Sequence, residues 1–582
     1  MCLRTSSHPK CLKEGVGDRA AALCPEAKRL NRKTSYPIEG VRIVLALRPA
    51  AGILSPAPGE DSRLFPMSRR PTSPAGMRAL ERTAPAAVLG AAGLIRDIES
   101  LSPEEDPQSM SNGKFDADVA VIGAGPGGYV AAIKAAQLGA SVVCIEKAYL
   151  GGTCLNVGCI PSKVWISSVE RLQHVRHAEQ LGVKVTGSVE PDFAAMNARV
   201  EKIVSTQRGG VGMLFKKNNV KHIEGTASFV DANTIQVVKD GQKQTLRAKC
   251  TIIAGGSSVM DLKIPGLEGG AEANVWTSDD AVFPKFIPKS VLVIGGGAVG
   301  CEFGYVLNGL GSKTTVVEMM TSLIPMFDED LGAELQRAFK KQGIEVLTGA
   351  MVEKAEKTKA GWKCHVKTPS GVQTIEAEVV LVGVGRKANV EGLNLDKIGV
   401  KQHKRGIEVV NNKMQTHVPN IYAVGDVIGK IQLAHVASME GIVAAHNAVL
   451  NDGKEMDYKS VPNCVYTVPE VASVGLTESE AKSQGHDVTI GKYNFRANGK
   501  AMAIVEQDGF AKVVAEKKYG EVLGVHIIGP HATDLIHEGV AAIKLEATLD
   551  YMVDTIHAHP TLAEPLLEAF EAAAHGKSIH TL

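Results

Sequence analysis

Apolar residues occur in short runs that lead into glycine-rich turns, and the first such run occupies residues 119–122. A helical pattern follows over residues 129–138, and a second apolar run covers residues 141–146. Short runs rich in β-branched residues are typical of strands buried in a parallel sheet. This order of elements predicts a β-α-β unit.

The same order recurs later, with strands predicted over residues 291–294 and 314–318 and a helix over residues 301–310. From about residue 460 the pattern changes to grouped strands (461–466, 510–515 and 522–528) and helices (534–546 and 562–573). Such grouping indicates an α+β domain. We therefore expect an α/β protein with two Rossmann-like dinucleotide-binding domains and a C-terminal α+β domain.

Residues 1–112 lack this periodicity and are rich in Pro, Ala, Ser and Arg, a composition that cannot build a core. A disordered tail, an organellar transit segment and a wrongly assigned start codon all fit it. Transit segments are poor in acidic residues, whereas this one contains Glu14, Asp18, Glu26 and Glu39. We favour a disordered extension without catalytic function, with Met110 as an alternative start of translation.

The turn after the first strand has the spacing G-x-G-x-x-G, with Gly123, Gly125 and Gly128 at the three glycine positions. In a dinucleotide-binding turn the first glycine permits the bend, the second lets a pyrophosphate approach, and the third lets helix and strand pack closely. Glu146 ends the second strand, where an acid hydrogen-bonds a ribose hydroxyl. The flanking strand, helix and acid make a purely structural turn the less favoured alternative.

The second unit repeats this spacing with Gly295, Gly297 and Gly300, and Glu318 takes the position of the acid. An acid there would repel a 2′-phosphate, and the next two residues are methionines rather than cations. The second site is therefore predicted to take NAD rather than NADP. Two such sites in one chain suggest one bound flavin, FAD, and one exchanging nicotinamide, NAD.

A third segment, residues 420–426, supports the flavin because it is an apolar run that ends in Gly-Asp. Asp426 is placed to accept a ribityl or ribose hydroxyl, although an ordinary strand and turn is the alternative for this segment alone. Ala434 lies at a predicted helix start whose free N–H groups would face the flavin. Gly385, in a predicted link between domains, is also counted among the cofactor-binding residues.

Cys154 and Cys159 differ from the other cysteines because they lie just after the first β-α-β unit, separated by four residues. An undistorted helix would hold them too far apart for a disulfide, which requires Cα atoms within about 7 Å. Gly158 and Pro161 favour a distorted segment. A cysteine pair beside a flavin can exchange electrons, and the charge of Lys163 would stabilise a thiolate or the reduced flavin, so Lys163 is also counted among the cofactor-binding residues. Two buried structural cysteines are the alternative.

His559 and Glu564 lie in the run His-Ala-His-Pro-Thr-Leu-Ala-Glu, before the last predicted helix. Histidine titrates near neutral pH, so it can take a proton from a thiol and return it. Glu564 would fix the tautomer of the ring. By this local pattern alone, a packed or surface histidine is the more common outcome.

The stretch from Gly151 to Lys163 resembles the signature of the class I pyridine nucleotide-disulfide oxidoreductases. Leu155 and the Ile-Pro-Ser-Lys run at 160–163 look more like the branch of that family that oxidises dihydrolipoamide than like glutathione reductase. The resemblance extends from about residue 116 to residue 574.

This resemblance implies a homodimer with four domains in each subunit. They are an FAD-binding domain (113–259), an NAD-binding domain (260–388), a central domain that completes the FAD site (389–459) and an interface, or dimerisation, domain (460–582). The resemblance also implies lipoyl-bearing E2 or H-protein subunits of 2-oxo acid dehydrogenase or glycine cleavage complexes as partners.

The resemblance further assigns roles to the candidate residues. Cys154 and Cys159 would form the redox disulfide, Lys163 would pair with Glu302 near the flavin, and His559 with Glu564 would be an acid–base dyad supplied by the other subunit. The expected reaction is oxidation of protein-bound dihydrolipoamide to lipoamide with reduction of NAD⁺.

Composition changes this picture only by exclusion. The chain has 64 Lys and Arg against 63 Asp and Glu, which favours neither nucleic acid nor an anionic membrane as a partner. No apolar run reaches the roughly 20 residues that span a bilayer, and no cysteine pairs have zinc spacing. We expect a soluble, cytoplasmic enzyme without a metal, with a mitochondrion or plastid as the alternative if residues 1–112 are a transit segment.

Two positions depart from the family's pattern. Gly255 stands where threonine is usual, and Gly383 where alanine or threonine is usual, so weaker local order with unchanged chemistry is expected. The alternatives to the favoured function are a mercuric or glutathione reductase-like enzyme and a non-catalytic assembly subunit. The chain ends without the cysteine pair typical of mercuric reductase, and a non-catalytic subunit is expected to lack one of Cys154, Cys159 and His559.

Overall fold

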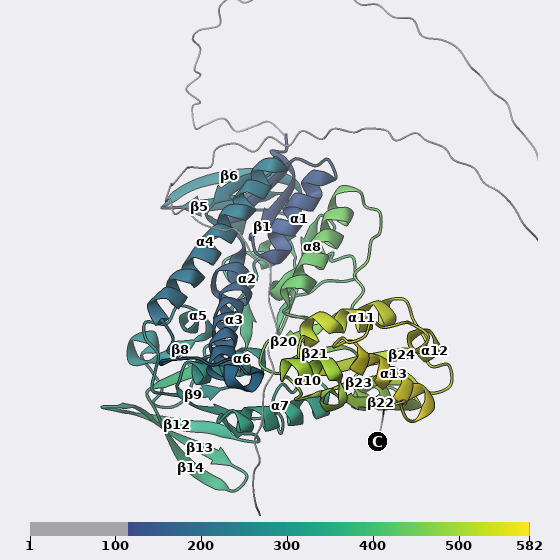
Figure 1. Ribbon diagram of the computed structural model, residues 1–582. Helices are drawn as coiled ribbons and strands as arrows, with labels where there is room; N and C mark the ends of the chain where they lie inside the picture. The colour runs from purple at the N-terminus through teal and green to yellow at the C-terminus, as the bar shows by residue number, and fades with distance from the viewer. Residues whose placement is uncertain (1–113, 581–582) are drawn as a thin grey trace, which may run out of the picture. The chain divides into compact units, whose positions relative to one another are not determined.

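The computed structural model describes residues 114–580. The expectations for residues 1–112, including the alternative start at Met110, lie outside the described residues. The predicted fold class is confirmed, because the described part contains two mainly parallel sheets with helices and a separate antiparallel C-terminal sheet (Figure 1).

The first sheet has the strand order β3-β2-β1-β6-β5-β4, and β19 pairs with β6. Pairing is parallel among β3, β2, β1, β6 and β19 and antiparallel from β6 through β5 to β4. Helices α1 and α8 lie side by side next to this sheet (Figure 1). The elements are β1 (Ala117–Ile122), α1 (Pro126–Gln137), β2 (Val142–Glu146), β3 (Lys221–Glu224), β4 (Thr226–Phe229), β5 (Thr234–Lys239), β6 (Gln242–Ile253), β19 (Ile421–Ala423) and α8 (Ala434–Val449).

The second sheet, β11-β10-β9-β15-β8, is parallel throughout. A small antiparallel sheet, β12-β13-β14, is inserted in the chain between β11 and β15. The elements are β8 (Val275–Thr277), β9 (Ser290–Ile294), α6 (Ala298–Gly309), β10 (Lys313–Val317), α7 (Glu329–Lys341), β11 (Glu345–Leu347), β12 (Met351–Thr358), β13 (Gly361–Thr368), β14 (Gly371–Ala377) and β15 (Val379–Val382).

Both β-α-β units form as predicted, but their helices begin three residues earlier than the apolar pattern indicates, at Pro126 and Ala298. The first turn of each helix consists of the glycines and small residues of the G-x-G-x-x-G turn. It therefore carries no apolar periodicity from which a helix can be read. Each helix is capped by the middle glycine, Gly125 or Gly297, and has no side-chain cap.

The C-terminal part is an antiparallel sheet with the strand order β20-β21-β24-β23-β22 and a hydrophobic core of its own. Helix α11 packs on β21 and β24, and α13 packs on β22 and β23. A Cβ on Gly491 would lie 1.9 Å from the Ala569 carbonyl oxygen, so β22 and α13 touch through their backbones. The elements are β20 (Asn463–Val465), β21 (Glu470–Gly475), α9 (Glu478–Ser483), β22 (Val488–Asn494), β23 (Phe510–Glu516), β24 (Val522–Gly529), α11 (Ala532–Lys544), α12 (Leu549–Val553) and α13 (Glu564–His575).

A buried lysine joins this C-terminal sheet to the second unit. The side chain of Lys512, on β23, is 4% exposed, and its Nζ lies 2.9 Å from Asp328, 3.1 Å from Asp330 and 2.8 Å from Glu478. Burial raises the pKa of Asp330, but hydrogen bonds from Lys512 and Lys492 outweigh it and hold that pKa below its ordinary value. Asp328 is 3% exposed and depends on Lys512 for a cation, whereas Asp330 and Glu478 also pair with Lys492 and Lys482.

We predict that Lys512→Met destabilises the protein by about 3–5 kcal/mol at neutral pH, because it leaves Asp328, whose side chain is 3% exposed, without its cation. Since Lys512 lowers the pKa of Asp330 and Glu478, its contribution is full above the unfolded carboxyl pKa of roughly 4 and is lost as the pH falls through the folded values. Urea unfolding midpoints of the two proteins at neutral and acidic pH measure the stabilisation by Lys512 and its pH dependence.

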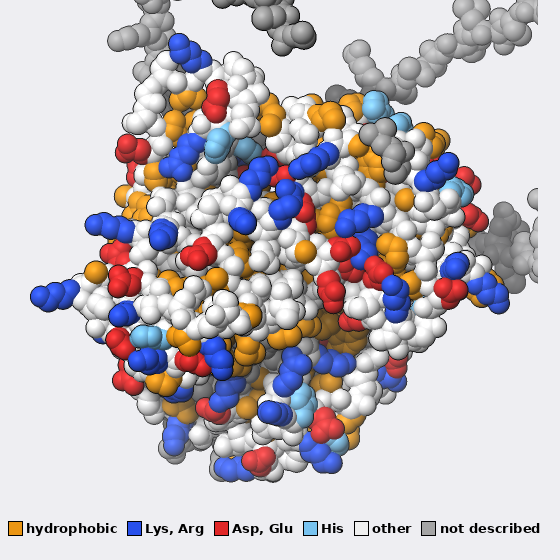
Figure 2. All heavy atoms as spheres, turned by 90° about the horizontal axis from the view of Figure 1, so that it is seen from below, with side chains coloured by type: hydrophobic (Ala, Val, Ile, Leu, Met, Phe, Trp, Pro, Cys, Tyr) orange, Lys and Arg blue, Asp and Glu red, His pale blue; other side chains and the backbone are white. Residues whose placement is uncertain are grey.

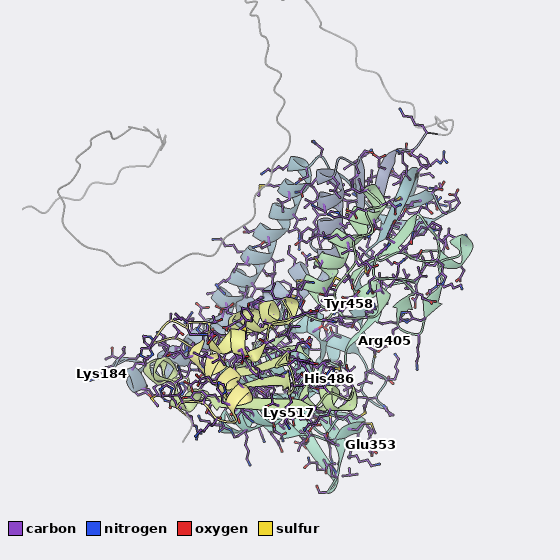
Figure 3. All side chains as sticks on the ribbon, turned by 90° about the vertical axis from the view of Figure 1, so that its right-hand side faces the viewer. Lys184, Glu353, Arg405, Tyr458, His486 and Lys517 are labelled. Atoms are coloured by element: carbon purple, nitrogen blue, oxygen red, sulfur yellow. The ribbon has the colours of Figure 1, made fainter. Side chains whose placement is uncertain are left out.

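The matched control is Lys517→Met, since Lys517 lies on the same sheet's outer turn with its side chain 65% exposed (Figure 3). An equal loss in both variants, or a loss for Lys512→Met that does not shrink in acid, would contradict the proposed role of the buried cation.

Candidate active site

The two candidate redox cysteines lie on different helices. Cys154 is in α2 (Gly152–Val157) and Cys159 begins α3 (Cys159–Arg176), with Gly158 between them at φ −137° and ψ −115°. A Cβ on Gly158 would lie 2.9 Å from the Thr153 carbonyl oxygen, so only glycine fits this break. The distortion expected from the sequence is present, and it brings the two sulfurs into hydrogen-bond contact.

The redox segment lies directly against the first glycine turn. The Gly151 N–H donates to the Ala124 carbonyl oxygen at 2.8 Å, and a Cβ on Gly152 would lie 2.6 Å from the Cα of Gly125. Gly152 also has a left-handed φ of +57°. The cysteine pair and the first predicted dinucleotide turn are therefore neighbours through backbone contact.

The electrostatics of the pair favour one thiolate. Both thiols are free. The hydrogen bond from Cys154 lowers the pKa of Cys159 to about 7, with support from Lys163 and against the effect of burial. The same hydrogen bond, together with burial, raises the pKa of Cys154. Cys159 is thus the sulfur that carries negative charge near neutral pH.

Lys163 forms the expected pair with Glu302, with 2.7 Å between its Nζ and Oε2. The Lys163 Nζ also lies 4.3 Å from the centre of the Tyr466 ring, and the Tyr466 N–H donates to Glu302 Oε1 at 3.1 Å. The pair forms because α3 packs on α6, where a Cβ on Gly309 would lie 2.3 Å from Val169. Nothing in the sequence pattern pointed to Tyr466.

The first glycine turn has the geometry that a bound dinucleotide requires. A Cβ on Gly123 would lie 2.3 Å from the Ala254 carbonyl oxygen, and one on Gly128 would lie 1.8 Å from the Gly123 carbonyl oxygen. A Cβ on Gly125 would meet only the Gly152 Cα, at 3.9 Å. Packing therefore explains the outer glycines but not the middle one, whose missing side chain fits the approach of a pyrophosphate.

The second turn repeats this geometry. A Cβ on Gly295 would lie 2.6 Å from the Gly383 carbonyl oxygen and one on Gly300 would lie 1.8 Å from the Gly295 carbonyl oxygen, whereas one on Gly297 would meet nothing within 4 Å. Glu318 accepts hydrogen bonds from Gly296 N at 2.6 Å and Met320 N at 2.7 Å.

Glu146 makes the matching contacts in the first turn, with Ala124 N at 2.7 Å and Ala148 N at 2.8 Å. Both predicted ribose-binding acids are thus fixed beside their glycine turns by two backbone N–H groups. Each oxygen keeps lone pairs for a further donor.

Asp426 follows β19 and accepts a hydrogen bond from the Ser257 hydroxyl. Helix α8 begins at Ala434 as predicted, without a side-chain cap, so its first N–H groups are open to a ligand. Gly385 has a φ of +116°, and the next residue, Arg386, donates to Ser257. Ser257 and Arg386 lie in the two expected links between domains, residues 254–257 and 384–386, and the sequence pattern assigned neither of them a role.

Gly255 and Gly383 behave differently towards an added side chain. A Cβ on Gly255 would lie 3.1 Å from the Asn389 carbonyl oxygen, which is tight, whereas one on Gly383 would lie 3.5 Å from Gly300 N, an ordinary contact. The Asn389 amide donates to the Gly255 carbonyl oxygen at 3.0 Å. The weaker order expected at these positions stays a prediction.

His559 and Glu564 form a pair at the start of α13, with 2.7 Å between His559 Nδ1 and Glu564 Oε1. The Thr561 N–H donates to Glu564 Oε2 at 2.8 Å. Burial raises the pKa of Glu564, but the hydrogen bonds from His559 and Thr561 outweigh it, so this carboxyl stays ionised. The His559 side chain is 78% exposed, and Nδ1 is the ring nitrogen that Glu564 holds.

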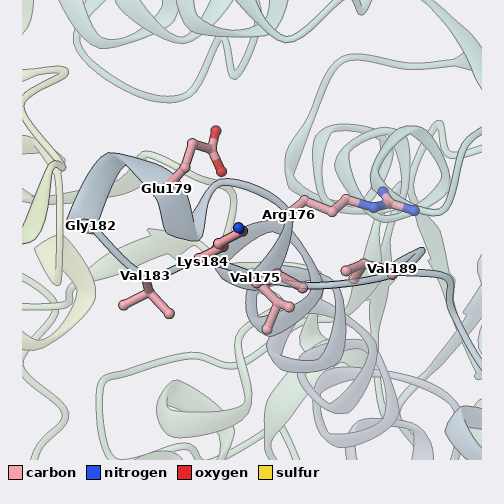
Figure 4. A pocket seen from close by; sticks show the side chains of 9 residues that line it. Val175, Arg176, Glu179, Gly182, Val183, Lys184 and Val189 are labelled. Carbon is pink, nitrogen blue, oxygen red and sulfur yellow. The ribbon is translucent and has the colours of Figure 1, made fainter.

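The pocket drawn in Figure 4 does not belong to this site. It has a volume of about 550 Å³ and is lined by residues such as Val175, Glu179 and Lys184. These residues lie at the end of α3 opposite to Cys159, about 25 Å away along the helix.

The surface and the described helices add three observations. Basic and acidic side chains are interspersed over the face shown in Figure 2. No helix within residues 114–580 is long and apolar enough to cross a membrane. In the same part of the chain, no group of three or more His, Cys, Asp and Glu side chains is arranged to hold a metal ion.

Two G-x-G-x-x-G turns in β-α-β units, with a thiol pair against one of them, are typical of a disulfide oxidoreductase that uses pyridine nucleotides. Residues 117–441 match the family model described as pyridine nucleotide-disulphide oxidoreductase, and residues 461–570 match its dimerisation domain. The chain belongs to this family, whose members use FAD and NAD(H).

Individual relatives agree with this assignment. The chain is 42% identical to a dihydrolipoyl dehydrogenase of Geobacillus stearothermophilus over 80% of its length and 98% of the relative's. It is also 42% identical to a mitochondrial dihydrolipoyl dehydrogenase of Pisum sativum, over 81% of this chain and 94% of the relative. The solved flavoprotein disulfide reductase RclA of Escherichia coli has the same fold, with a TM-score of 0.69 and 23% identity over 78% of this chain and 99% of that one.

We predict that Gly297→Ala folds normally but weakens NAD⁺ use, because its methyl group fills only the space intended for the ligand. Displacing a bound group by about 1 Å costs on the order of 100-fold in kcat/KM. Gly300→Ala is the contrast, since its Cβ overlaps the backbone and is expected to cost about 1–3 kcal/mol or more of stability. Unfolding midpoints and NAD⁺ kinetics separate the two effects, and an unstable Gly297→Ala protein would contradict the role of Gly297 in ligand approach.

We also predict that Cys159 in the reduced protein reacts with iodoacetamide with a midpoint near pH 7, which is its lowered pKa. Lys163→Met removes a cation that favours the thiolate, so the midpoint is expected to rise towards the ordinary thiol value of about 8.5. Alkylation rates resolved by residue in a mass spectrometer measure this. Lys184→Met, in the segment that follows α3, is the control, and equal midpoints in all three proteins would refute the role of Lys163.

Proposed function

We propose that this protein oxidises protein-bound dihydrolipoamide to lipoamide and reduces NAD⁺ to NADH. The observation that carries the proposal is the thiol pair held against the first glycine turn, with Lys163 and Glu302 beside it. The two dihydrolipoyl dehydrogenases at 42% identity support the choice of substrate, because the chain covers nearly their whole length.

The sulfur chemistry takes place on the chain's own residues. With Cys154 and Cys159 joined as a disulfide, a substrate thiolate attacks the Cys154 sulfur. The bond between the two cysteines breaks, and Cys159 leaves as a thiolate, the form that its pKa of about 7 favours. The second substrate thiol then attacks the substrate sulfur of the mixed disulfide, which closes lipoamide and releases Cys154. Two electrons have moved from substrate to protein.

The cofactors fit the two glycine turns. Bound FAD supplies the change from thiol chemistry to hydride chemistry, which lets NAD⁺ accept the electron pair. The proposed FAD-binding groups are Gly123, Gly125, Gly128, Glu146, Asp426 and the start of α8 at Ala434, with Gly385 in the nearby link. The proposed NAD-binding groups are Gly295, Gly297, Gly300 and Glu318.

Proton transfer is assigned to His559, which accepts the proton of the first substrate thiol at Nε2 while Glu564 holds Nδ1. His559 is proposed to act on the cysteine pair of a second subunit, and the family's dimerisation domain in residues 461–570 supports this. Exposed apolar side chains in the same domain also support a face that a second subunit covers. The side chains of Leu545, Tyr551 and Ile556 are 79%, 76% and 96% exposed.

The proposed partners are a second copy of this chain and the lipoyl-bearing E2 or H-protein subunits of 2-oxo acid dehydrogenase or glycine cleavage complexes. The proposed location is the cytoplasm, and a mitochondrion or plastid is the alternative if residues 1–112 are a transit segment. The location of a full-length fluorescent fusion distinguishes these compartments.

We predict that the purified protein oxidises dihydrolipoamide with NAD⁺ and shows little activity with glutathione disulfide and NADPH. His559→Gln is expected to lower kcat with dihydrolipoamide by roughly 10²–10⁴-fold, because the substrate thiol loses its base. Reduction of the cysteine pair by NADH, counted as free thiols, is expected to stay unchanged, since no substrate thiol takes part.

His177→Gln, at an exposed histidine after the end of α3, serves as the control. Full activity of a Cys154→Ser/Cys159→Ser protein would end the proposal. Faster turnover of glutathione disulfide would replace it with a glutathione reductase-like function, and inactivity with every disulfide would favour an assembly subunit.

A further inference from the structure

Arg386 connects three parts of the candidate site that are far apart in the sequence. It lies on β16 (Arg386–Ala388), which pairs with β7 (Ser257–Val259) in the link between the two nucleotide-binding units. Its side chain is only 19% exposed. No motif identified in the sequence gave this residue a role.

The guanidinium holds Ser257 with two donors. Arg386 Nε donates to Ser257 Oγ at 2.8 Å, and Nη2 donates to the Ser257 carbonyl oxygen at 2.9 Å. A hydroxyl has one hydrogen, and here that hydrogen goes to Asp426. Because Arg386 occupies a lone pair of the same hydroxyl, it fixes the direction in which Ser257 donates to Asp426.

The outer end of the guanidinium reaches two other segments. Nη2 lies 3.4 Å from Thr153 Oγ1, in the residue before Cys154, and Nη1 lies 3.6 Å from Asp279, on a short helix of the second unit. A planar fork with several donors can make these contacts together, whereas a lysine ammonium has no such fixed geometry.

We propose that Arg386 is a positioning residue of the redox site. Through Ser257 it orients the Asp426 carboxylate, and through Thr153 it restrains helix α2, which carries Cys154. The Asp426 carboxylate and the Cys154 sulfur thereby keep a fixed separation. The proposal rests on the proposed function for the assignment of Asp426 to FAD and of Cys154 to the substrate.

Two readouts on the FAD-loaded protein separate the effect of Arg386 on Ser257 from its effect on Thr153. Neither readout needs dihydrolipoamide. The first is the rate of FAD release, followed by the fluorescence of free flavin. The second is the rate at which iodoacetamide alkylates Cys154 in the reduced protein. Arg386→Gln is expected to speed FAD release roughly 10-fold to 100-fold, the loss typical of a charge-assisted hydrogen bond. It is also expected to raise Cys154 alkylation severalfold, because a less restrained turn opens more often.

Single-arm variants make the test specific. Ser257→Ala is expected to speed FAD release without changing Cys154 alkylation, and Thr153→Val to do the reverse. Arg386→Lys is expected to resemble Arg386→Gln, because it keeps the charge but loses the fork. The double variant Ser257→Ala/Arg386→Gln is expected to release FAD no faster than Arg386→Gln. Both changes break the same chain of hydrogen bonds, from Arg386 through Ser257 to Asp426.

Lys387→Gln is the matched control, because Lys387 is the next residue and pairs with Glu391 at the surface. Additive effects in the double variant, equal effects of Lys387→Gln, or normal values of both readouts in Arg386→Gln would overturn the proposal. If Arg386→Gln does not fold, Ser257→Ala and Thr153→Val decide it by their separate effects. A protein that fails with dihydrolipoamide but shows this pattern would refute the proposed function alone.

Discussion

The close approach of two backbones at Gly125 and Gly152 is the constraint on which the rest of the site depends. No side chain fits between them, since a Cβ on Gly152 would lie 2.6 Å from the Cα of Gly125. The segment that carries the thiols is thereby held on the turn that we propose for the pyrophosphate. A longer connection would leave the distance between sulfur and cofactor to side-chain motion, whereas direct backbone contact fixes it.

Helix α3 extends this constraint to the second nucleotide-binding unit. It begins at Cys159, carries Lys163 one turn later, and packs on α6 with a glycine at the contact. Since Glu302 lies on α6, the ion pair at the thiols is also a contact between the two units. The position of the Lys163 charge, which favours a Cys159 thiolate, therefore depends on the position of the second unit. Lys512 provides a comparable fixed contact between the second unit and the C-terminal sheet.

The local parts of this arrangement could be predicted from the sequence, because each depends on residues that are close together in the chain. The glycine turns, the break at Gly158 and the His559–Glu564 pair all follow from spacings of a few residues. The Lys163–Glu302 pair came from the family resemblance, since no local pattern joins residues 139 positions apart. Tyr466, Ser257 and Arg386 were missed for the same physical reason. Each acts through a contact made by the folded chain, which the expected links at 254–257 and 384–386 did not reveal.

The two glycine turns have the same backbone arrangement but differ in the residues that surround them. At Gly125 the redox segment comes within 3.9 Å of the position of an added Cβ, whereas at Gly297 nothing of the described chain comes within 4 Å. A ligand at the first turn would lie beside the redox segment, and the uncapped N-terminus of α8 would offer it further N–H groups. A ligand at the second turn would be held from fewer sides. Because dissociation requires a path that the protein leaves open, this difference favours a retained cofactor at the first turn and an exchanging one at the second. The different surroundings of the two turns thus agree with the proposed order of FAD and NAD along the chain.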